Sequence, residues 1–349
     1  GTEADVLRIT GEGTGWGGFK IRILTQNLWA VPIVSQCMEA RVHAFLRTLG
    51  SWDIMALQEV WHGRERDAIR RAAQNSGLRY CRHFQLGYGL PLLGLGSGGT
   101  GLMILSRYPI TETLFQRFLV NGHPCHLKHP KYRHCLGVNG VGLARVCTPA
   151  GSVDVYVTHL HGPCTRGSGS GTGSGLGLGL GDGEGSSVRH KAHQVAQSFQ
   201  LSHFINTTRK SPLVVLLADL SAGPQSLPYA LQRSMSGMID AFHEVQPLDA
   251  GYTFGAKENI FRKRRSPPAR VDYVFYKTLP PPLCHPQRIE PHWELRTSWV
   301  QQTLVPDSDV QGLLGEGPRL RLGVERGGAA GVQGLGAEAE ASQASRGRG

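Results

Sequence analysis

A carboxylate stands at the end of a long apolar segment of this sequence. Residues 213–221 (LVVLLADLS) contain no polar side chain before Asp219 and lie between Pro212 and Pro224. Their length and β-branched content predict a strand buried on both faces, and the flanking prolines disfavour a buried turn of helix. A buried carboxylate is costly to ionise without a partner. Asp219 therefore either caps the following turn, the commoner role of one such residue, or faces a metal or a substrate.

Four other apolar segments also bring a polar side chain to or near one end. Residues 21–24 precede Asn27, residues 53–57 precede Glu59, residues 153–157 precede His159, and residues 271–276 carry Asp272. Because the ends of adjacent strands converge in space, one cleft can hold all five side chains. The set is therefore a candidate site rather than a collection of isolated polar residues.

The residue types in this set define the chemistry that it can perform. Carboxylates with an asparagine, and no thiolate cluster, form a set of hard oxygen donors that suits Mg²⁺, which binds few carboxylates and keeps positions for water and substrate phosphate. A metal in this position polarises a phosphoryl oxygen and stabilises charge on the leaving oxygen. Phosphoryl transfer also needs a base for water and an acid for the leaving group. His159 is well placed to contact the phosphate or the leaving oxygen.

The overall composition limits the class of protein. The chain has 349 residues, of which 40% are hydrophobic and 18% charged, as in soluble globular proteins with one large core or two domains. Its formal net charge of +11 favours nucleic acid, phospholipid surfaces or phosphate-bearing substrates as partners, although part of this charge can be a solvated arginine-rich surface. Seven cysteines without zinc-binding spacing argue against a disulfide scaffold or a zinc site and indicate a reducing compartment. No signal peptide and no apolar run of about 18 residues is visible.

The pattern of apolar residues predicts a mixed pair of sheets with helices outside. Apolar residues at steps of three and four predict helices over residues 37–49 and 188–206, and a charged helix is expected over residues 64–74. Three strands follow one another with short links, at residues 101–106, 140–146 and 153–157. Since a βαβ beginning gives way to consecutive strands, and no dinucleotide-binding or P-loop glycine motif is present, a Rossmann sheet is disfavoured.

Segments of low complexity frame and interrupt this core. Residues 1–18 are Gly-rich and polar and are expected to form a flexible N-terminal arm. Residues 165–187 predict a flexible surface insertion and residues 313–349 a disordered tail, because neither composition can bury a core. His190 and His193, on the helix after the insertion, have a spacing compatible with metal binding. No third ligand is evident nearby, so we assign both to solvent or to the rim of the site.

Six motifs occur in the order in which the endonuclease/exonuclease/phosphatase (DNase I-like) superfamily carries them. They are QNLW at Asn27, LQEVW at Glu59, GTGLMILSRYPI at residues 99–110, YVTHLH at His159, LLADLS at Asp219 and ARVDYVFYK at Asp272. Within that superfamily the chain resembles the neutral sphingomyelinases, particularly the type 1 form, through HKAHQVAQSFQLSHFI, DAF and RVDYVFYK. The resemblance covers residues 19–309. It implies a four-layer α/β/β/α sandwich of two mixed sheets with outer helices, and a catalytic domain over residues 19–312.

The resemblance also implies a reaction, the Mg²⁺-dependent hydrolysis of sphingomyelin to ceramide and phosphocholine. Glu59 would ligate Mg²⁺ with help from Asn27. Asp219 would orient the attacking water, and His159 would stabilise or protonate the leaving group. Asp272 would support the site from behind these residues. A further assignment of the resemblance is to substrate or phosphate binding, for Asn27, Ser221 and Asp272.

Two positions depart from the motifs of the family. The family sequence Gly-Asp-Leu-Asn is ADLS at residues 218–221, and the hydroxyl of Ser221 has one donor fewer than an asparagine amide. The family sequence Ser-Asp-His is SDV at residues 308–310, where Asp309 would orient a general-base histidine that is Val310 in this chain. Valine cannot accept a proton, and loss of a general base typically costs about 10²–10⁴-fold in rate. The resemblance therefore predicts an impaired enzyme.

The sequence stops following the family at Val310. Every valine codon begins with GT, the usual intron donor dinucleotide, so we hypothesise that residues 310–349 are translated intron or a wrongly assigned exon. A gene whose transcripts all read through this segment, with none encoding histidine at its start, would contradict that hypothesis.

The expected partners follow from the charge and the resemblance. Sphingomyelin or a related choline phospholipid is the expected substrate, and Mg²⁺ is the expected cofactor. Adsorption to an anionic membrane surface, worth about 1 kcal/mol per basic residue near that surface, predicts an intracellular protein bound peripherally to membranes. Two alternatives stay open, a nuclease of the same superfamily, which the basic charge allows, and a non-catalytic phospholipid-binding protein. Nucleic acid is the less favoured partner because no DNA-reading insertion is evident.

Overall fold

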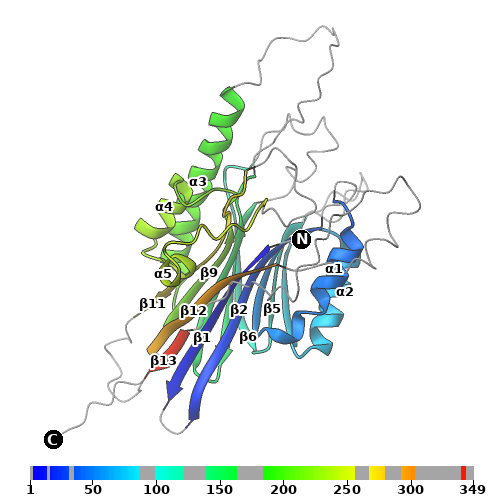
Figure 1. Cartoon of the computed structure of the whole chain (residues 1–349), viewed down its shortest axis with the longest axis vertical. Coiled ribbons are helices and arrows are strands. Elements are labelled where there is room, and N and C mark those ends of the chain that lie inside the picture. Colours follow the sequence, from blue (N-terminus) through cyan, green and yellow to red (C-terminus); the bar gives the residue numbers. More distant parts are fainter. Residues whose placement is uncertain are drawn as a thin grey trace, which may run out of the picture.

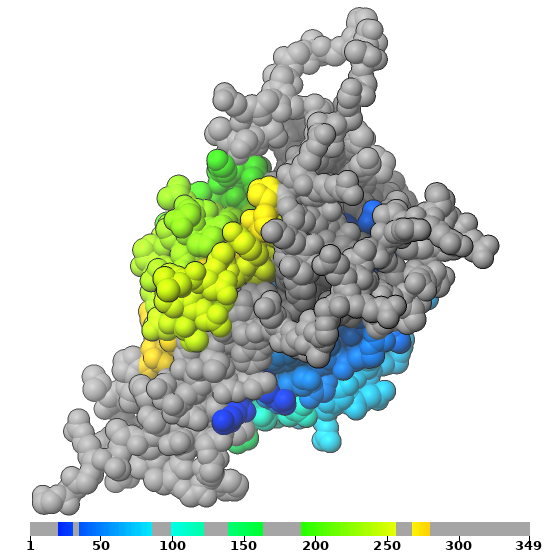
Figure 2. All heavy atoms as spheres, in the orientation of Figure 1, coloured from blue at the N-terminus to red at the C-terminus, as the bar shows by residue number. Residues whose placement is uncertain are grey.

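Two β-sheets pack face to face, and helices cover the outer face of each (Figure 1). The computed structural model describes residues 3–13, 16–30, 35–85, 99–121, 139–162, 184–255, 267–279, 292–302 and 339–342. Helices α1 (Met38–Leu46) and α2 (Gly63–Asn75) cover one sheet, and α3 (Glu184–Thr208) and α4 (Leu227–Ser234) cover the other. The two helical layers lie on different sides of the molecule in Figure 2, where α1 and α2 are blue and α3 and α4 are green to yellow-green. The expected four-layer sandwich with outer helices is confirmed.

Each sheet contains one parallel pair of strands among antiparallel neighbours. The seven-stranded sheet has the order β13 (Ala339–Ser342), β12 (His292–Gln302), β1 (Glu3–Gly13), β2 (Trp16–Ala30), β3 (Ile54–Val60), β5 (Gly99–Ser106), β4 (Tyr80–Gln85). The six-stranded sheet has the order β10 (Ile239–Asp240), β11 (Asp272–Thr278), β9 (Leu213–Asp219), β8 (Gly151–His159), β7 (Gly140–Thr148), β6 (Ile110–Arg117). The parallel pairs are β2–β3 and β8–β9, so both sheets are mixed as expected.

Alternating side chains explain how the strands fill two kinds of core. The odd residues of β9, at 213, 215 and 217, lie in the apolar cluster between the two sheets. The even residues, at 214, 216 and 218, lie in a cluster with residues of α3 and α4. All seven residues of β9 are buried, which confirms the prediction of a strand buried on both faces. A third cluster joins α1 and α2 to the outer face of the seven-stranded sheet.

A buried ion pair fixes the start of β11. Arg270 donates to both carboxylate oxygens of Asp240, from Nη1 at 3.2 Å and from Nη2 at 2.6 Å. Its guanidinium also lies 4.9 Å from the ring centroid of Tyr273 and 5.1 Å from that of Phe242. Asp240 caps α5 (Ala241–Val245) by accepting from the Phe242 amide. A planar guanidinium suits such a bidentate, stacked position, which holds the strand that carries Asp272.

Segments that the composition predicts to be flexible are partly strands and helix. Within the expected flexible arm over residues 1–18, residues 3–13 form β1 and residues 16–18 begin β2, and β1 pairs with residues 16–26 of β2. Backbone hydrogen bonds to β2 and β12 satisfy this segment whatever its side chains, so a Gly-rich composition does not exclude a strand. The expected disordered tail likewise contains β13, paired with β12. Helix α3 begins inside the expected insertion 165–187, whose residues 165–183 lie outside the described part of the chain.

The buried His83 in β4 makes stability depend on pH. Its Nε2 lies 3.4 Å from the Val60 carbonyl, and burial, with Arg66 acting in the same direction, lowers its pKa from 6.5 to about 4. Between those values the unfolded chain binds the proton and the folded chain does not, so the free energy of unfolding falls as pH falls from 6.5 to 4. We expect wild type to lose about 2–3 kcal/mol more than His83→Gln across this window in urea titrations. Equal losses in the two proteins would contradict the prediction.

Candidate active site

Four of the predicted side chains meet in the described structure, two from each sheet. Asn27 of β2 donates from Nδ2 to Glu59 Oε1 at 3.1 Å and to Asp219 Oδ2 at 2.8 Å. His159 of β8 lies beside both carboxylates, with Nε2 3.4 Å from Asp219 Oδ2 and Nδ1 4.0 Å from Glu59 Oε1. The side chains of Glu59, His159 and Asp219 are 12%, 18% and 7% exposed, so the cluster is reachable from solvent but mostly buried. The two parallel strand pairs bring these side chains together at their carboxyl ends.

Strand alternation aims three of these side chains into the space between the sheets. Residues 21 and 23 of β2, 153, 155 and 157 of β8, and 213, 215 and 217 of β9 all lie in the core between the sheets. Asn27, His159 and Asp219 continue these odd-numbered series, so their side chains emerge on the same face where the apolar core ends. The positions of the three therefore follow from the sequence once the strands are known.

Glu59 reaches the same space although its position in β3 is out of phase. Ile54 and Ala56 face the other sheet, so strict alternation places Gln58 there rather than Glu59. Glu59 has a left-handed backbone with φ 58°, and the β2–β3 register shifts between Asn27 and Ala30. Such irregularities re-aim side chains next to active sites. The left-handed turn accounts for the contact between the Glu59 carboxylate and Asn27.

Backbone strain gathers at this cluster. In the described part of the chain four residues other than glycine have positive φ, and three of them belong to the site, namely Trp29, Glu59 and Ser221, at 45°, 58° and 49°. Each such residue costs on the order of 1–3 kcal/mol and persists only where its surroundings fix it. Strained residues typically cluster at functional sites, so their concentration at these strand ends supports the candidate site.

The two carboxylate oxygens of Asp219 have different partners. Its Oδ1 accepts from the Ser221 amide at 2.7 Å and from the Ser221 hydroxyl at 3.1 Å, which caps the turn after β9. Its Oδ2 faces Asn27 and His159 instead. The Ser221 hydroxyl also lies 3.4 Å from His159 Nε2. Ser221 therefore connects the carboxylate and the imidazole in spite of lacking the amide that the family carries there.

Arg41 in α1 holds the backbone that follows Asn27, and sequence reasoning missed it. Its guanidinium donates to the carbonyls of Leu28 at 2.6 Å and Trp29 at 3.0 Å, and lies 4.9 Å from the centroid of the Trp29 ring. Burial lowers the pKa of Arg41 to about 10, with Glu59 among the groups that act in the opposite direction. The signal available in the sequence is an arginine within the apolar stripe of the predicted helix.

Two further predicted residues have different outcomes. Asp272 lies opposite Asp219 in the β9–β11 register, is 4% exposed, and its amide donates to Thr253 Oγ1 at 3.1 Å. It is therefore next to the cluster, on the strand that begins where β9 ends. Asp309, with Val310 after it, lies outside the described residues, so its predicted role stays a prediction.

Glu59 has the features of a ligand for a hard cation. Its Oε2 is buried and has no hydrogen-bond partner among the described residues, while Oε1 is held by Asn27. A buried, unpaired carboxylate oxygen is costly unless a cation or water satisfies it. Asn27 points its amide nitrogen at the carboxylates, and its Oδ1 accepts from the Trp29 amide, so it would have to turn its amide over to act as a ligand. The residues therefore fit Mg²⁺ through Glu59, with Asn27 positioned as a donor to the carboxylates.

Other candidate sites in the described structure do not match this one. The rings of His190 and His193 have a third histidine beside them, since His161 lies 5.4 Å and 5.5 Å from their centroids, a neighbour that the sequence analysis missed. Even so, no group of three or more His, Cys, Asp or Glu side chains among the described residues is arranged to hold a metal ion.

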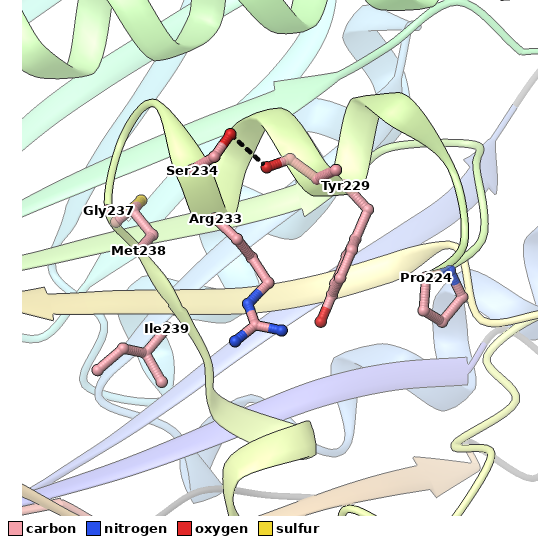
Figure 3. A pocket seen from close by; sticks show the side chains of 8 residues that line it. Pro224, Tyr229, Arg233, Ser234, Gly237, Met238 and Ile239 are labelled. Atoms are coloured by element: carbon pink, nitrogen blue, oxygen red, sulfur yellow. Dashed lines mark hydrogen bonds between the residues drawn. The ribbon is translucent and has the colours of Figure 1, made fainter.

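A cavity of about 530 Å³ lies beside α4 and β10 and is lined by Pro224, Tyr229, Ala230, Arg233, Ser234, Gly237, Met238 and Ile239 (Figure 3). It contains none of the four clustered side chains.

The fold is a sandwich of two mixed sheets with a carboxylate–imidazole cluster between them, and the family follows from the sequence match. Residues 24–295 match the Endonuclease/Exonuclease/phosphatase family, and the chain belongs to that family. It is 29% identical over 266 residues to a protein of Drosophila melanogaster named putative neutral sphingomyelinase, covering 74% of this chain and 52% of that one. It is 26% identical over 274 residues to human sphingomyelin phosphodiesterase 2, covering 74% and 56%. The chain thus spans about half the length of these relatives.

Solved structures support the fold. A variant of beta toxin from Staphylococcus aureus with bound magnesium ions superimposes with a TM-score of 0.51 at 14% identity, over 80% of this chain and 89% of that one. Identity at this level speaks for the fold alone. In the part of this chain that the structure describes, no helix has the length and apolar character needed to cross a membrane.

Proposed function

We propose that this chain is a Mg²⁺-dependent phosphodiesterase that hydrolyses sphingomyelin to ceramide and phosphocholine. The observation that carries the proposal is the contact of Asn27 with both Glu59 and Asp219, with His159 beside them, at the junction of the two sheets. Hard oxygen donors next to an imidazole suit metal-assisted attack on a phosphodiester. The names of the relatives suggest the lipid substrate, and the match to the Endonuclease/Exonuclease/phosphatase family supports hydrolysis of a phosphoester.

Each side chain has a defined part in this proposed reaction. Glu59 would hold Mg²⁺, which when bound would polarise the phosphoryl group and offset its charge. Asp219 Oδ2 is the acceptor that would orient the attacking water, because Oδ1 already accepts two bonds from Ser221 whereas Oδ2 accepts one, from Asn27. The water oxygen would form the new bond to phosphorus, and the bond from phosphorus to the ceramide oxygen would break. The proton of the water would pass to solvent, because Val310 stands where the family carries its base. His159 would deliver a proton from Nε2 to that leaving oxygen.

A second function is favoured by one specific observation in the sequence. The residue after Asp309 is Val310, where the family motif places the histidine that takes the proton of the water. A chain that keeps Glu59 and Asn27 but lacks this base can bind a choline phospholipid through Mg²⁺ without turning it over. Peripheral attachment to anionic membranes, for which the net charge of +11 provides the attraction, belongs to both proposals.

Turnover in lipid micelles separates these functions. We expect the purified chain with Mg²⁺ to release ceramide and phosphocholine from sphingomyelin in anionic mixed micelles, and EDTA to stop the release. Abasic DNA in the same buffer is expected to stay intact. Cleavage of the DNA without release of ceramide would replace the lipid substrate by nucleic acid. Mg²⁺-dependent co-sedimentation with sphingomyelin vesicles, without products, would select the binding protein.

A further inference from the structure

Helix α3 carries two glutamines, Gln194 and Gln197, on its buried face. Its buried face passes through positions 194, 197, 198, 201 and 205, at steps of three and four. Leu201 and Ile205 belong to the apolar cluster on the outer face of the six-stranded sheet. Gln197 and Gln194, about one and two turns before Leu201, are 0% and 4% exposed. A buried amide is costly unless its hydrogen bonds are made, so what these two amides bind indicates why they are there.

Gln194 binds the turn that follows Asp219. Its Nε2 donates to the Ser221 carbonyl at 3.0 Å and to the Leu220 carbonyl at 3.3 Å. Ser221 is the residue with φ 49° whose amide and hydroxyl hold Asp219 Oδ1. A left-handed serine persists only where its surroundings fix it, and Gln194 supplies such a fixing contact. Through Ser221, the side chain of Gln194 therefore acts on the orientation of the Asp219 carboxylate.

Gln197 binds the end of the neighbouring strand. Its Oε1 accepts from the His161 amide at 2.8 Å, two residues beyond His159, and its Nε2 donates to the Val120 carbonyl at 2.8 Å. The two ends are also joined directly, since the Leu160 amide donates to the Asp219 carbonyl at 2.9 Å. One face of one helix thus holds both strand ends that carry the acid and the water-orienting carboxylate.

We propose that Gln194 and Gln197 are positioning residues that set the separation of His159 and Asp219. The inference rests on the proposed function for its catalytic consequence, although the positioning itself can be measured without turnover. Neither glutamine touches the reacting atoms in this arrangement. Their effect is to keep Asp219 Oδ2 and His159 Nε2 at the 3.4 Å seen here, since a small misplacement of catalytic groups lowers rate strongly.

The chain offers a matched control, a buried glutamine that contacts α3 but neither of the two strand ends. Gln232 of α4 is 0% exposed and donates from Nε2 to the carbonyl and to the hydroxyl of Ser198, at 3.0 Å and 2.7 Å. It joins α4 to α3 but makes no bond to the ends of β8 or β9 among its described contacts. Gln194→Met and Gln232→Met both remove buried hydrogen bonds with little change in volume. Only the first acts at the turn after Asp219.

The test compares these variants by rate and by amide exchange. With sphingomyelin in Mg²⁺ micelles, Gln194→Met is expected to lower kcat about 10- to 100-fold with KM changed less than about twofold, and Gln232→Met to change kcat less than about twofold. Exchange of the Ser221 amide hydrogen, followed by NMR on the full chain, is expected to be about tenfold faster in Gln194→Met and unchanged in Gln232→Met. Gln194→Glu, whose carboxylate cannot donate, serves if the methionine variant does not fold.

Each outcome decides the proposal. Equal losses of kcat in Gln194→Met and Gln232→Met, or unchanged Ser221 exchange in both Gln194 variants, overturn the positioning role. If wild type releases no ceramide, the proposed function fails, and the exchange experiment still decides the positioning. Faster Ser221 exchange confined to the Gln194 variants then supports the role, and equal exchange in all proteins overturns it.

Discussion

Glu59→Gln is expected to lower kcat/KM for sphingomyelin by about 10³-fold or more at a fixed Mg²⁺ concentration. The amide keeps the size of the side chain and can still contact Asn27, but it removes the negative charge and the buried Oε2 that has no described partner. Charge stabilisation by a bound metal is worth several kcal/mol in phosphoryl transfer, which corresponds to this loss of rate. Steady-state kinetics and calorimetric titration with Mg²⁺ measure the two effects separately.

Glu39→Gln is the matched control for this prediction. Glu39 lies in α1 with its side chain 65% exposed and pairs only loosely with Arg64, at 3.5 Å. The same change of charge is therefore made away from the site, and rate and Mg²⁺ affinity are expected to stay within about twofold of wild type. A Glu59→Gln protein that keeps wild-type Mg²⁺ affinity would remove Glu59 from the metal site and leave the cluster without its assigned ligand.

Val310→His is expected to raise kcat by about 10²–10⁴-fold, which is the contribution of a positioned general base. In the family motif the histidine follows an aspartate that orients it, and the aspartate is present here as Asp309. The restored imidazole would take the proton from the water that Asp219 orients. Its pH–rate profile should rise through the ordinary histidine range near pH 6.5, because only the neutral ring accepts a proton.

Val310→Ala separates a base from a mere change of size. Alanine accepts no proton, so this variant is expected to match wild type in both kcat and pH profile. Equal rates for Val310→His and Val310→Ala would mean that another group or hydroxide already removes the proton, or that the segment after Asp309 does not reach the site. The first of these outcomes requires wild type itself to be active.

The alternation of side chains along the strands predicts the directions of three of the four clustered side chains. The apolar run at 213–218 fixes both faces of β9, so the burial and direction of Asp219 follow from it. The same parity places Asn27 and His159 on the facing side of their strands. Glu59 is different, because parity alone aims it at the helices, and only its left-handed backbone turns it to the site. Its place after an apolar segment and the motif resemblance both singled out Glu59, whereas the direction of its side chain could not be predicted from the pattern.

The supporting contacts are harder to predict, because they join residues far apart in the sequence through polar atoms of the backbone. Arg41 binds carbonyls of β2, and Gln194 binds carbonyls after β9. Because the acceptors are backbone groups, the types of residue that carry them do not reveal these contacts. The strand β1 escaped prediction for a related reason, since its pairing with β2 uses backbone groups that every residue has. Composition therefore indicates which segments can form the hydrophobic core, but not which segments pair as strands through their backbones.

Placing half of the cluster on each sheet also has a consequence for the order of events in folding. The contact between Asn27 and Asp219 joins residues 192 positions apart, so forming it closes a long loop of the chain. Neither sheet alone contains the complete set of four side chains. Competence for the proposed chemistry would then arrive with the docking of the two sheets, and would be lost first when that docking loosens on heating, ahead of the strands themselves.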